Sequence, residues 1–417
     1  MASRAIDMRA NGNARAPAVF LVAGEVSGDQ NAALLADAIR RLAPGVRLMG
    51  AGGAAMSSAG VDVQVHTADL HFMGVPSVRA VISMISAYLR VLSIISKLRP
   101  DVVVFIDNES TNLFLANRLH RKGIPIVFFF PPQVWFWGRW RIPRIARIAR
   151  RVISAFAEEA SFYHAAGADT VCVGHPLRDS VRLEENPAEA IRSIGLDPSR
   201  PIAGLMPGSR RPEVAGLLQV MLDTARILKA RDESLQFALP LASESFRDEV
   251  ERAAKASGLR DLAIYRPRSY AVLSQAQVLL QCSGTASLEA ALLGIPSVVA
   301  YRSSRLVHFV ARRMMYVRYI SITNLLLHEM VQPEFFNKNL DAEHLAEAVW
   351  PLLKDPERRR AIKVRLAAVR DLLGPAGVSA RAAKAVLDLL PINSAFEDSE
   401  QPAPETRAFE KAQAVSK

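Results

Sequence analysis

The sequence predicts two consecutive α/β domains, each a doubly wound parallel sheet covered by helices on both faces. The chain has 417 residues, and half of them are apolar, so it can bury a large core. Short runs rich in Val, Ile, Leu and Phe alternate with longer helical patterns, as parallel strands with helical crossovers require. The alternation pauses near residues 175–187 and then restarts, which indicates a domain boundary there.

The first half contains three strand–helix units. Its strands are expected within residues 16–24, 101–107 and 124–130, and the helical segments that follow them within 30–42, 111–121 and 139–151. These strands are continuously apolar instead of alternating with polar residues. We therefore expect a sheet that is buried on both faces.

The second half repeats the pattern and ends in helices. Its strands are expected within residues 201–208, 235–241, 276–284 and 296–301, with helices over 213–231, 244–257 and 286–293. Residues 342–390 read as helices broken near Asp355–Pro356 and Gly374–Pro375. We expect domains over 17–177 and 178–390, with disordered ends at 1–16 and 391–417 because both are polar.

Composition limits the class of protein. The 52 Lys and Arg residues exceed the 41 Asp and Glu residues and give a net charge of +11, which favours an anionic partner. Two cysteines are too few for a disulfide scaffold or a Cys-rich zinc module. The N-terminus lacks the apolar region of a secretory signal, and no uncharged run reaches the length of a spanning helix. These features predict a cytoplasmic protein that meets a membrane only at its surface.

Two loops after expected strands of the first half carry reactive side chains. Ligands bind doubly wound domains at the carboxyl ends of strands. In the loop 23–29, two glycines allow close backbone approach, and Ser27 or Asp29 can cap the next helix. A tight capped turn does not require Glu25, so this side chain is a candidate for binding. In the loop 107–112, Asp107 ends a buried strand, where a carboxylate can act as a base. A simple capped turn is the alternative for each.

Two loops of the second half suit a nucleoside diphosphate. The segment 206–213 combines a Gly-Ser turn with Arg210, whose guanidinium can donate to a diphosphate. Ser283, Gly284 and Thr285 open a helix that can bind a phosphate, and Glu289 lies one turn further on, within reach of a ribose hydroxyl. Together the two loops predict a nucleotide-diphosphate site.

Other motifs are weaker. Residues 50–55 fit the pattern G-x-G-x-x-A after a short strand, but this strand is the second in the chain and not the first, as the dinucleotide fingerprint requires. No ribose-binding acid ends a strand about 20 residues further on, which also disfavours NAD. Histidine and acidic spacings do not predict a metal site. We interpret Cys282 as a packing residue because no base is assigned to it, and we expect His175 to make an interdomain hydrogen bond instead of acting in catalysis. No recognition helix or aromatic-rich RNA motif supports nucleic-acid binding.

Seven motifs occur in a fixed order between about residues 18 and 345: GEVSGD, GAGG, PPQVWFW, VGHPL, PGSRRPE, SGTASLEAALLG and TNLLL. In this combination the chain resembles the lipid-A-disaccharide synthase family, inverting glycosyltransferases of the GT-B fold. The resemblance implies transfer of 2,3-diacylglucosamine from UDP to the 6-hydroxyl of 2,3-diacylglucosamine 1-phosphate, in lipid A synthesis at the cytoplasmic face of the inner membrane, without a cofactor. Another UDP-sugar enzyme of this fold and a non-catalytic paralogue are the alternatives.

The resemblance also implies roles for individual residues. Asp107 matches the general base of the family, although the loop after it departs from the family pattern and leaves Glu109 as an alternative base. Arg210, Glu289 and Asn324 match donor-side residues. The expected substrate-binding residues are Glu25, Ser27, Gly28, Asn112, Arg210, Ser283, Gly284, Thr285, Glu289 and Asn324. The sequence leaves a homodimer open.

An apolar stripe near residue 80 suggests where the protein meets lipid. The expected membrane-contact residues recur at near-helical spacing and are Met73, Val75, Val78, Val81, Ile82 and Ile85. Arg79 and Arg90 can extend to the interface, and the basic runs 139–151 and 302–318 can bind anionic headgroups. The alternative is that the stripe packs in the core.

Overall fold

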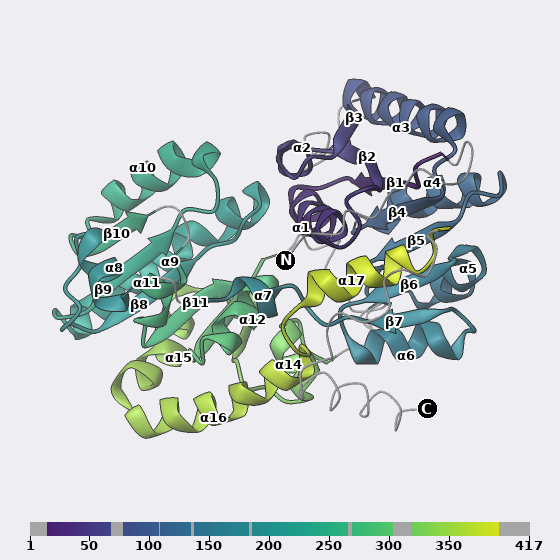
Figure 1. Cartoon of the computed structure of the whole chain (residues 1–417). Helices are drawn as coiled ribbons and strands as arrows, with labels where there is room; N and C mark the ends of the chain where they lie inside the picture. The colour runs from purple at the N-terminus through teal and green to yellow at the C-terminus, as the bar shows by residue number, and fades with distance from the viewer. Residues whose placement is uncertain are drawn as a thin grey trace, which may run out of the picture.

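The structure is a computed structural model that describes residues 15–67, 78–107, 109–134, 137–182, 186–265, 269–302 and 318–391. Within these residues the strands form two parallel sheets (Figure 1). The first has the order β3-β2-β1-β4-β5-β6-β7, and the second has the order β10-β9-β8-β11-β12-β13. Both orders reverse direction, beside β1 and beside β8. This is the doubly wound arrangement, so the predicted fold class is confirmed.

The first half builds the seven-stranded sheet and the helices on it. Its elements are β1 (Ala18–Ala23), α1 (Val26–Leu42), β2 (Arg47–Gly52), α2 (Ala54–Ser58), β3 (Asp62–His66), α3 (Val78–Leu98), β4 (Val102–Ile106), α4 (Glu109–His120), β5 (Ile126–Phe129), η1 (Arg139–Arg141), α5 (Ile142–Ile148), β6 (Arg151–Ser154), α6 (Ala157–Ala165) and β7 (Thr170–Cys172). The strands expected from the sequence are present as β1, β4 and β5. The short strands β6 and β7 extend the sheet beyond them.

The second half builds the six-stranded sheet. Its elements are α7 (Leu177–Ser180), α8 (Pro187–Ser193), β8 (Ile202–Met206), α9 (Arg211–Arg231), β9 (Gln236–Pro240), η2 (Glu244–Phe246), α10 (Arg247–Ser257), β10 (Leu262–Tyr265), α11 (Tyr270–Ser274), β11 (Val278–Cys282), α12 (Thr285–Leu292), β12 (Ser297–Tyr301), α14 (Ile322–Leu327), β13 (Glu334–Phe336), η3 (Asn337–Asn339), α15 (Ala342–Lys354), α16 (Pro356–Leu372) and α17 (Val378–Leu387). The two predicted breaks separate α15, α16 and α17, and the Asp355 carboxylate caps α16 by accepting from the Arg358 N–H.

The central strands β1, β4 and β5 of the first sheet are buried on both faces, which explains their continuously apolar sequences. On β1, Val19 and Leu21 pack in the cluster that contains residues of α1 and α17. Phe20 and Val22 point to the opposite face, where α3, α4 and α5 pack. Adjacent side chains of a strand therefore enter two different cores, and neither face tolerates a polar residue there.

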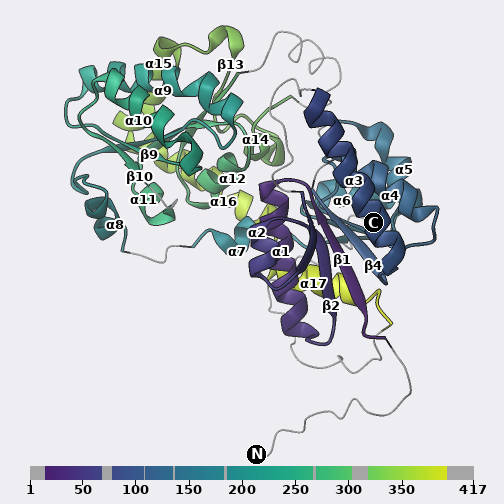
Figure 2. The same ribbon diagram turned by 90° about the horizontal axis from the view of Figure 1, so that it is seen from above.

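The last helix crosses back to the first half. Helix α17 lies beside α1 (Figure 2), and Val378 and Ala382 pack in the same core as β1. The carboxylate of Asp179 accepts hydrogen bonds from the backbone N–H groups of Gly377 (2.6 Å) and Val378 (2.9 Å), which caps α17. Arg151 of β6 donates to the Ala385 carbonyl at 2.9 Å. The domain limits expected from the sequence remain a prediction. The structure shows in addition that α17, at the end of the second half in sequence, packs on the first half.

A third apolar cluster joins the two halves. Ala155 and Phe156, which follow β6, pack with Leu288 and Ala291 of α12 and with residues of α14 and α16. Burying such side chains stabilises a contact by roughly 25 cal/mol per Å² of apolar surface. This cluster and the α17 crossing hold the loops of one half against those of the other.

Candidate active site

Asp107 lies directly after β4, in a backbone conformation that its neighbours impose. Its φ of +50° is in the left-handed region, which is uncommon for residues other than glycine. The buried Asn112 side chain donates from Nδ2 to the carbonyl oxygens of Asp107 (2.6 Å) and Ile106 (3.2 Å). Asn112 therefore acts on the backbone of Asp107 and holds the half-buried carboxylate at the strand end. Glu109 begins α4, and its side chain lies outside the described residues.

The first glycine loop packs against this strand end. A Cβ placed on Gly28 would lie 3.4 Å from the Ile106 carbonyl oxygen and 3.5 Å from the Asp107 Cβ. One turn further along α1, Asn31 Nδ2 lies 3.5 Å from Asp107 Oδ2. Ser27 is exposed beside them. The two loops that the sequence singled out in the first half therefore meet, and the small size of Gly28 allows the contact.

Arg210 connects the two halves. It precedes α9, and its guanidinium is 62% exposed. Its Nη2 lies 3.6 Å from Glu25 Oε2 in the first half, and its Nη1 lies 3.6 Å from Glu213 Oε1. Glu213 Oε2 also accepts from the backbone N–H groups of Ser209 (2.9 Å) and Arg210 (3.1 Å). A loop predicted to bind a diphosphate thus faces a loop of the other half.

The start of α12 forms the second loop of this half. Gly284 has a φ of +145°, a conformation that favours glycine, and its position before α12 provides no side-chain cap. The Ser283 hydroxyl donates to the Ile320 carbonyl oxygen at 3.0 Å, and Thr285 is exposed. Glu289 is buried further along α12. Such a helix start carries positive electrostatic potential and suits a phosphate.

Asn324 has a supporting position. Its Nδ2 donates to the Gln332 carbonyl oxygen (2.7 Å) and to Glu334 Oε1 (2.8 Å), and its Oδ1 accepts from the backbone N–H groups of Val331 and Gln332, both at 2.9 Å. The side chain is fully buried. These four bonds tie α14 to β13, so Asn324 positions the chain behind the α12 loop. The sequence could not reveal this, because three of the four bonds are to backbone groups of residues 331 and 332.

We expect Asn324→Ala to destabilise the protein by about 2–4 kcal/mol, because two buried N–H groups would lose their acceptor. Denaturant unfolding followed by circular dichroism measures this. Asn339→Ala is the matched control, since Asn339 is exposed. Equal unfolding midpoints for Asn324→Ala and the wild-type protein would contradict the supporting role.

Cys282 and His175 are structural. Burial raises the pKa of the Cys282 thiol to about 12, so it is a poor nucleophile at neutral pH. The His175 N–H donates to the Leu373 carbonyl oxygen at 2.9 Å, and its Nδ1 accepts from the Leu177 N–H at 3.2 Å. The bond that joins the end of the first half to the end of α16 is a backbone bond, whereas the imidazole itself bonds locally to Leu177.

The position of His175 predicts a pH dependence of stability. Burial lowers the pKa of His175 to about 4, whereas an unfolded histidine has a pKa of about 6.5. Between these values the unfolded chain binds a proton that the folded chain does not, so stability falls as the pH falls through this window. Thermal melts of the wild-type protein and His175→Asn from neutral pH to about pH 4 measure this. An identical pH dependence in both would contradict it.

The G-x-G-x-x-A segment has a structural explanation. The Asp29 carboxylate accepts from the backbone N–H groups of Gly53 (2.7 Å), Ala55 (2.9 Å) and Met56 (3.2 Å). A dinucleotide phosphate would need the same donors at the start of α2. This agrees with the sequence argument against NAD. Among the described residues, no group of three or more His, Cys, Asp or Glu side chains could hold a metal ion.

Comparison with known proteins identifies the family. A family model described as lipid-A-disaccharide synthetase matches residues 19–387. The chain belongs to this family. It is 37% identical over 373 residues to a lipid-A-disaccharide synthase of Geobacter sulfurreducens, covering 89% of this chain and 97% of the relative. A synthase of Nitrosococcus oceani is 34% identical over 361 residues, covering 86% and 93%. Membership confirms the predicted glycosyltransferase class and its place in lipid A disaccharide synthesis.

Solved structures share the fold of this family member at low identity. A putative UDP-N-acetylglucosamine 2-epimerase from Listeria monocytogenes has a TM-score of 0.60 at 13% identity, covering 93% of this chain and 99% of that one. The Methanocaldococcus jannaschii UDP-GlcNAc 2-epimerase in complex with UDP-GlcNAc and UDP has a TM-score of 0.57 at 12% identity, covering 89% and 99%. The glycotransferase of kitacinnamycin has a TM-score of 0.54 at 16% identity, covering 91% and 100%. These likenesses confirm the predicted GT-B architecture.

Proposed function

We propose that this glycosyltransferase joins UDP-2,3-diacylglucosamine to 2,3-diacylglucosamine 1-phosphate and releases the β-1,6-linked disaccharide phosphate and UDP. The observation that carries the proposal is the ion pair between Glu25 and Arg210, which brings the loops of the two halves within 3.6 Å. The first half then supplies the base and the second half holds the leaving group. Single-displacement chemistry requires these two functions on opposite faces of the sugar.

Asp107 acts as the base of the transfer. Its carboxylate accepts the proton of the acceptor 6-hydroxyl while that oxygen forms a bond to C1 of the donor sugar. The bond between C1 and the β-phosphate oxygen breaks on the other face, and its electron pair leaves with UDP. Attack opposite the leaving group converts an α-linked donor into a β-linked product. The bonds from Asn112 to the Asp107 backbone keep the base in place during this step.

Arg210 and the start of α12 stabilise the departing UDP. The guanidinium and the backbone N–H groups of Gly284 and Thr285 donate to the diphosphate, on which charge develops, whereas the Ser283 N–H already donates to the Ala300 carbonyl oxygen at 3.2 Å. On donor binding, Arg210 exchanges part of its contact with Glu25 for the diphosphate. Glu289 binds a ribose hydroxyl, in line with its place one turn into α12. Support for UDP comes from the epimerase of the same fold whose solved complex contains UDP-GlcNAc and UDP.

We expect Glu289→Ala to weaken UDP binding by roughly tenfold, because one charge-assisted hydrogen bond contributes about 1.5–3 kcal/mol. Isothermal titration calorimetry with UDP measures this. Glu343→Ala is the control, since Glu343 is exposed in the first turn of α15. Unchanged affinity in Glu289→Ala would remove Glu289 from the donor site.

Helix α3 supplies a membrane contact. Ile82, Ile85 and Leu89 are each half or more exposed, while Val91 and Ile95 of the same helix are buried in the core. The exposed stripe is therefore additional to the packing stripe. Met73 and Val75 lie outside the described residues, and the side chains of Val78 and Val81 are not described. The described helices include none that is long and apolar enough to cross a bilayer. We infer peripheral binding at the cytoplasmic face of the inner membrane.

Product analysis tests the proposed reaction. The purified chain is incubated with UDP-2,3-diacylglucosamine and 2,3-diacylglucosamine 1-phosphate in detergent, and the lipids are analysed by mass spectrometry. The proposal predicts a tetraacyl disaccharide phosphate and an equal amount of UDP. Release of UDP without a disaccharide, or transfer only to a different acceptor, would contradict it.

A further inference from the structure

The exposed apolar surface of the first half extends beyond α3. Half of the exposed large apolar side chains in the described part of the chain lie on α3, α4 and η1. Phe114 of α4 is 50% exposed and Trp140 of η1 is 55% exposed. Helix α4 packs beside both α3 and α5, and η1 leads directly into α5. In Figures 1 and 2, α3, α4 and α5 lie along the same side of the first half.

Arginines hold the aromatic side chains on this surface. The Arg118 guanidinium lies over the Phe114 ring, 4.4 Å from its centroid. The buried Arg141 lies 4.0 Å from the Trp137 ring and 5.7 Å from the Trp140 ring, and the two indoles pack edge to face. The surface around Trp140 is therefore preorganised. Tryptophan is enriched at membrane interfaces, where its ring lies at the level of the headgroups.

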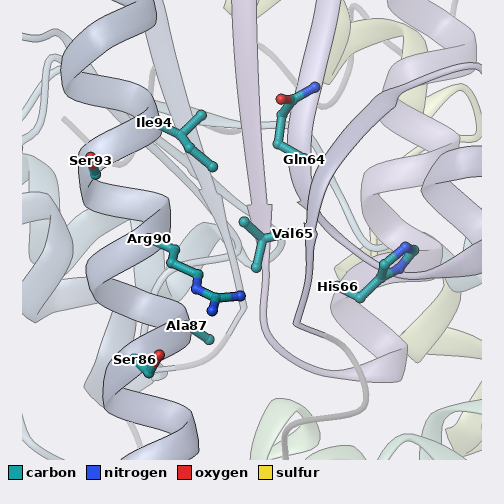
Figure 3. A pocket seen from close by; sticks show the side chains of 8 residues that line it. All are labelled: Gln64, Val65, His66, Ser86, Ala87, Arg90, Ser93 and Ile94. Atoms are coloured by element: carbon teal, nitrogen blue, oxygen red, sulfur yellow. The ribbon is translucent and has the colours of Figure 1, made fainter.

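The charge of these elements fits an anionic bilayer. Elements α3, α4, η1 and α5 contain one acidic residue, Glu109. Apart from Arg141, which is buried, their Lys and Arg residues are Arg79, Arg90, Lys97, Arg118, Arg139, Arg144 and Arg147. Arg90 extends from α3 toward Val65 of β3, beside a cavity of about 580 Å³ (Figure 3). Cationic residues near an anionic surface each contribute about 1 kcal/mol to binding.

We propose that Phe114 and Trp140 form a second membrane anchor, whose partner is an anionic lipid bilayer. The inference rests on the proposed function for its first anchor, α3. A single helix on a bilayer leaves the protein free to rotate about that helix, whereas a second anchor on neighbouring elements fixes its orientation. Helix α4 starts two residues after Asp107, at the carboxyl edge of the sheet. The second anchor thus holds the edge that bears the base against the lipid surface, where the acylated acceptor resides.

Vesicle binding of the full chain tests the second anchor. The probe is vesicles of phosphatidylcholine and phosphatidylglycerol at low salt, with phosphatidylcholine vesicles for comparison. Phe114→Ser/Trp140→Ser is expected to weaken binding at least about tenfold, because each side chain loses apolar contact with lipid. Met330→Ser/Val364→Ser is the matched control, since both residues are exposed in the second half. Thermal melts verify that each variant is folded.

Two further measurements separate the outcomes. Brominated lipids should quench the tryptophan fluorescence of the wild-type protein more than that of Trp140→Phe.

The activity of Phe114→Ser/Trp140→Ser depends on how the acceptor is presented. When the acceptor is embedded in vesicles, this variant should lose activity at least about tenfold, but in detergent its activity should match that of the wild-type protein. Wild-type binding by this variant, with loss in Ile82→Ser/Ile85→Ser, would overturn the second anchor and retain α3. No binding by the wild-type protein would overturn both, whereas transfer in detergent tests the reaction itself.

Discussion

Asp107→Asn is expected to lower kcat by about 10²–10⁴-fold, the contribution typical of a general base. The amide cannot accept the proton of the acceptor hydroxyl, but it retains the shape of the carboxylate. Because Asp107 acts on the acceptor, the KM for the UDP-sugar should change little. Steady-state assays of UDP release, with active enzyme counted by UDP binding, measure both constants.

Glu109→Gln distinguishes the two candidate bases. Glu109 is two residues away on α4 and is the alternative that the sequence left open. If Asp107 is the base, Glu109→Gln should retain most of the turnover. Normal turnover in Asp107→Asn together with a large loss in Glu109→Gln would transfer the role to Glu109.

Arg210→Ala is expected to lower kcat/KM by about 10²–10³-fold, because the charge that develops on departing UDP would lose a preorganised donor. Arg210→Lys should recover only part of this loss, since an ammonium cannot donate two parallel hydrogen bonds to a diphosphate. Stopped-time assays at several UDP-sugar concentrations separate the effect on binding from the effect on turnover.

The neighbouring arginine is the control for this prediction. Arg211 is as exposed as Arg210, but it pairs with Glu249 at 3.5 Å and lies over the Phe246 ring, away from the first half. Arg211→Ala should therefore retain near-normal activity. Equal losses in the two variants would show that net charge, and not the position of Arg210, matters.

The sequence predicted the strands β1, β4, β5, β8, β9, β11 and β12 and most of the loops because these depend on local patterns. Continuously apolar runs such as 102–106 cannot be exposed on either face, and the helix breaks at Pro356 and Pro375 follow from the missing N–H of proline. The strand β6 has four residues and continues the basic segment 139–151, and β7 has only three residues, so periodicity gave no signal for either strand.

Long-range partners could not be predicted in the same way. The apolar face of α17 would fit either half, and only its contact with β1 shows where it packs. Asn324 matched a donor-side motif, yet its amide is bonded to residues 331–334. Glu25 was expected to bind substrate, and its partner in this structure is Arg210. Each of these contacts joins residues far apart in the chain, and residue spacing alone does not encode them.

The configuration of the new glycosidic bond distinguishes a single displacement from other mechanisms. In the proposed reaction, a base in one half and the leaving-group site in the other act together in one displacement at C1. Proton NMR of the purified disaccharide phosphate, made from an α-linked UDP donor, reports the anomeric coupling. This mechanism predicts a β-1,6 linkage. An α linkage would contradict it, because retention of configuration requires a different arrangement of groups.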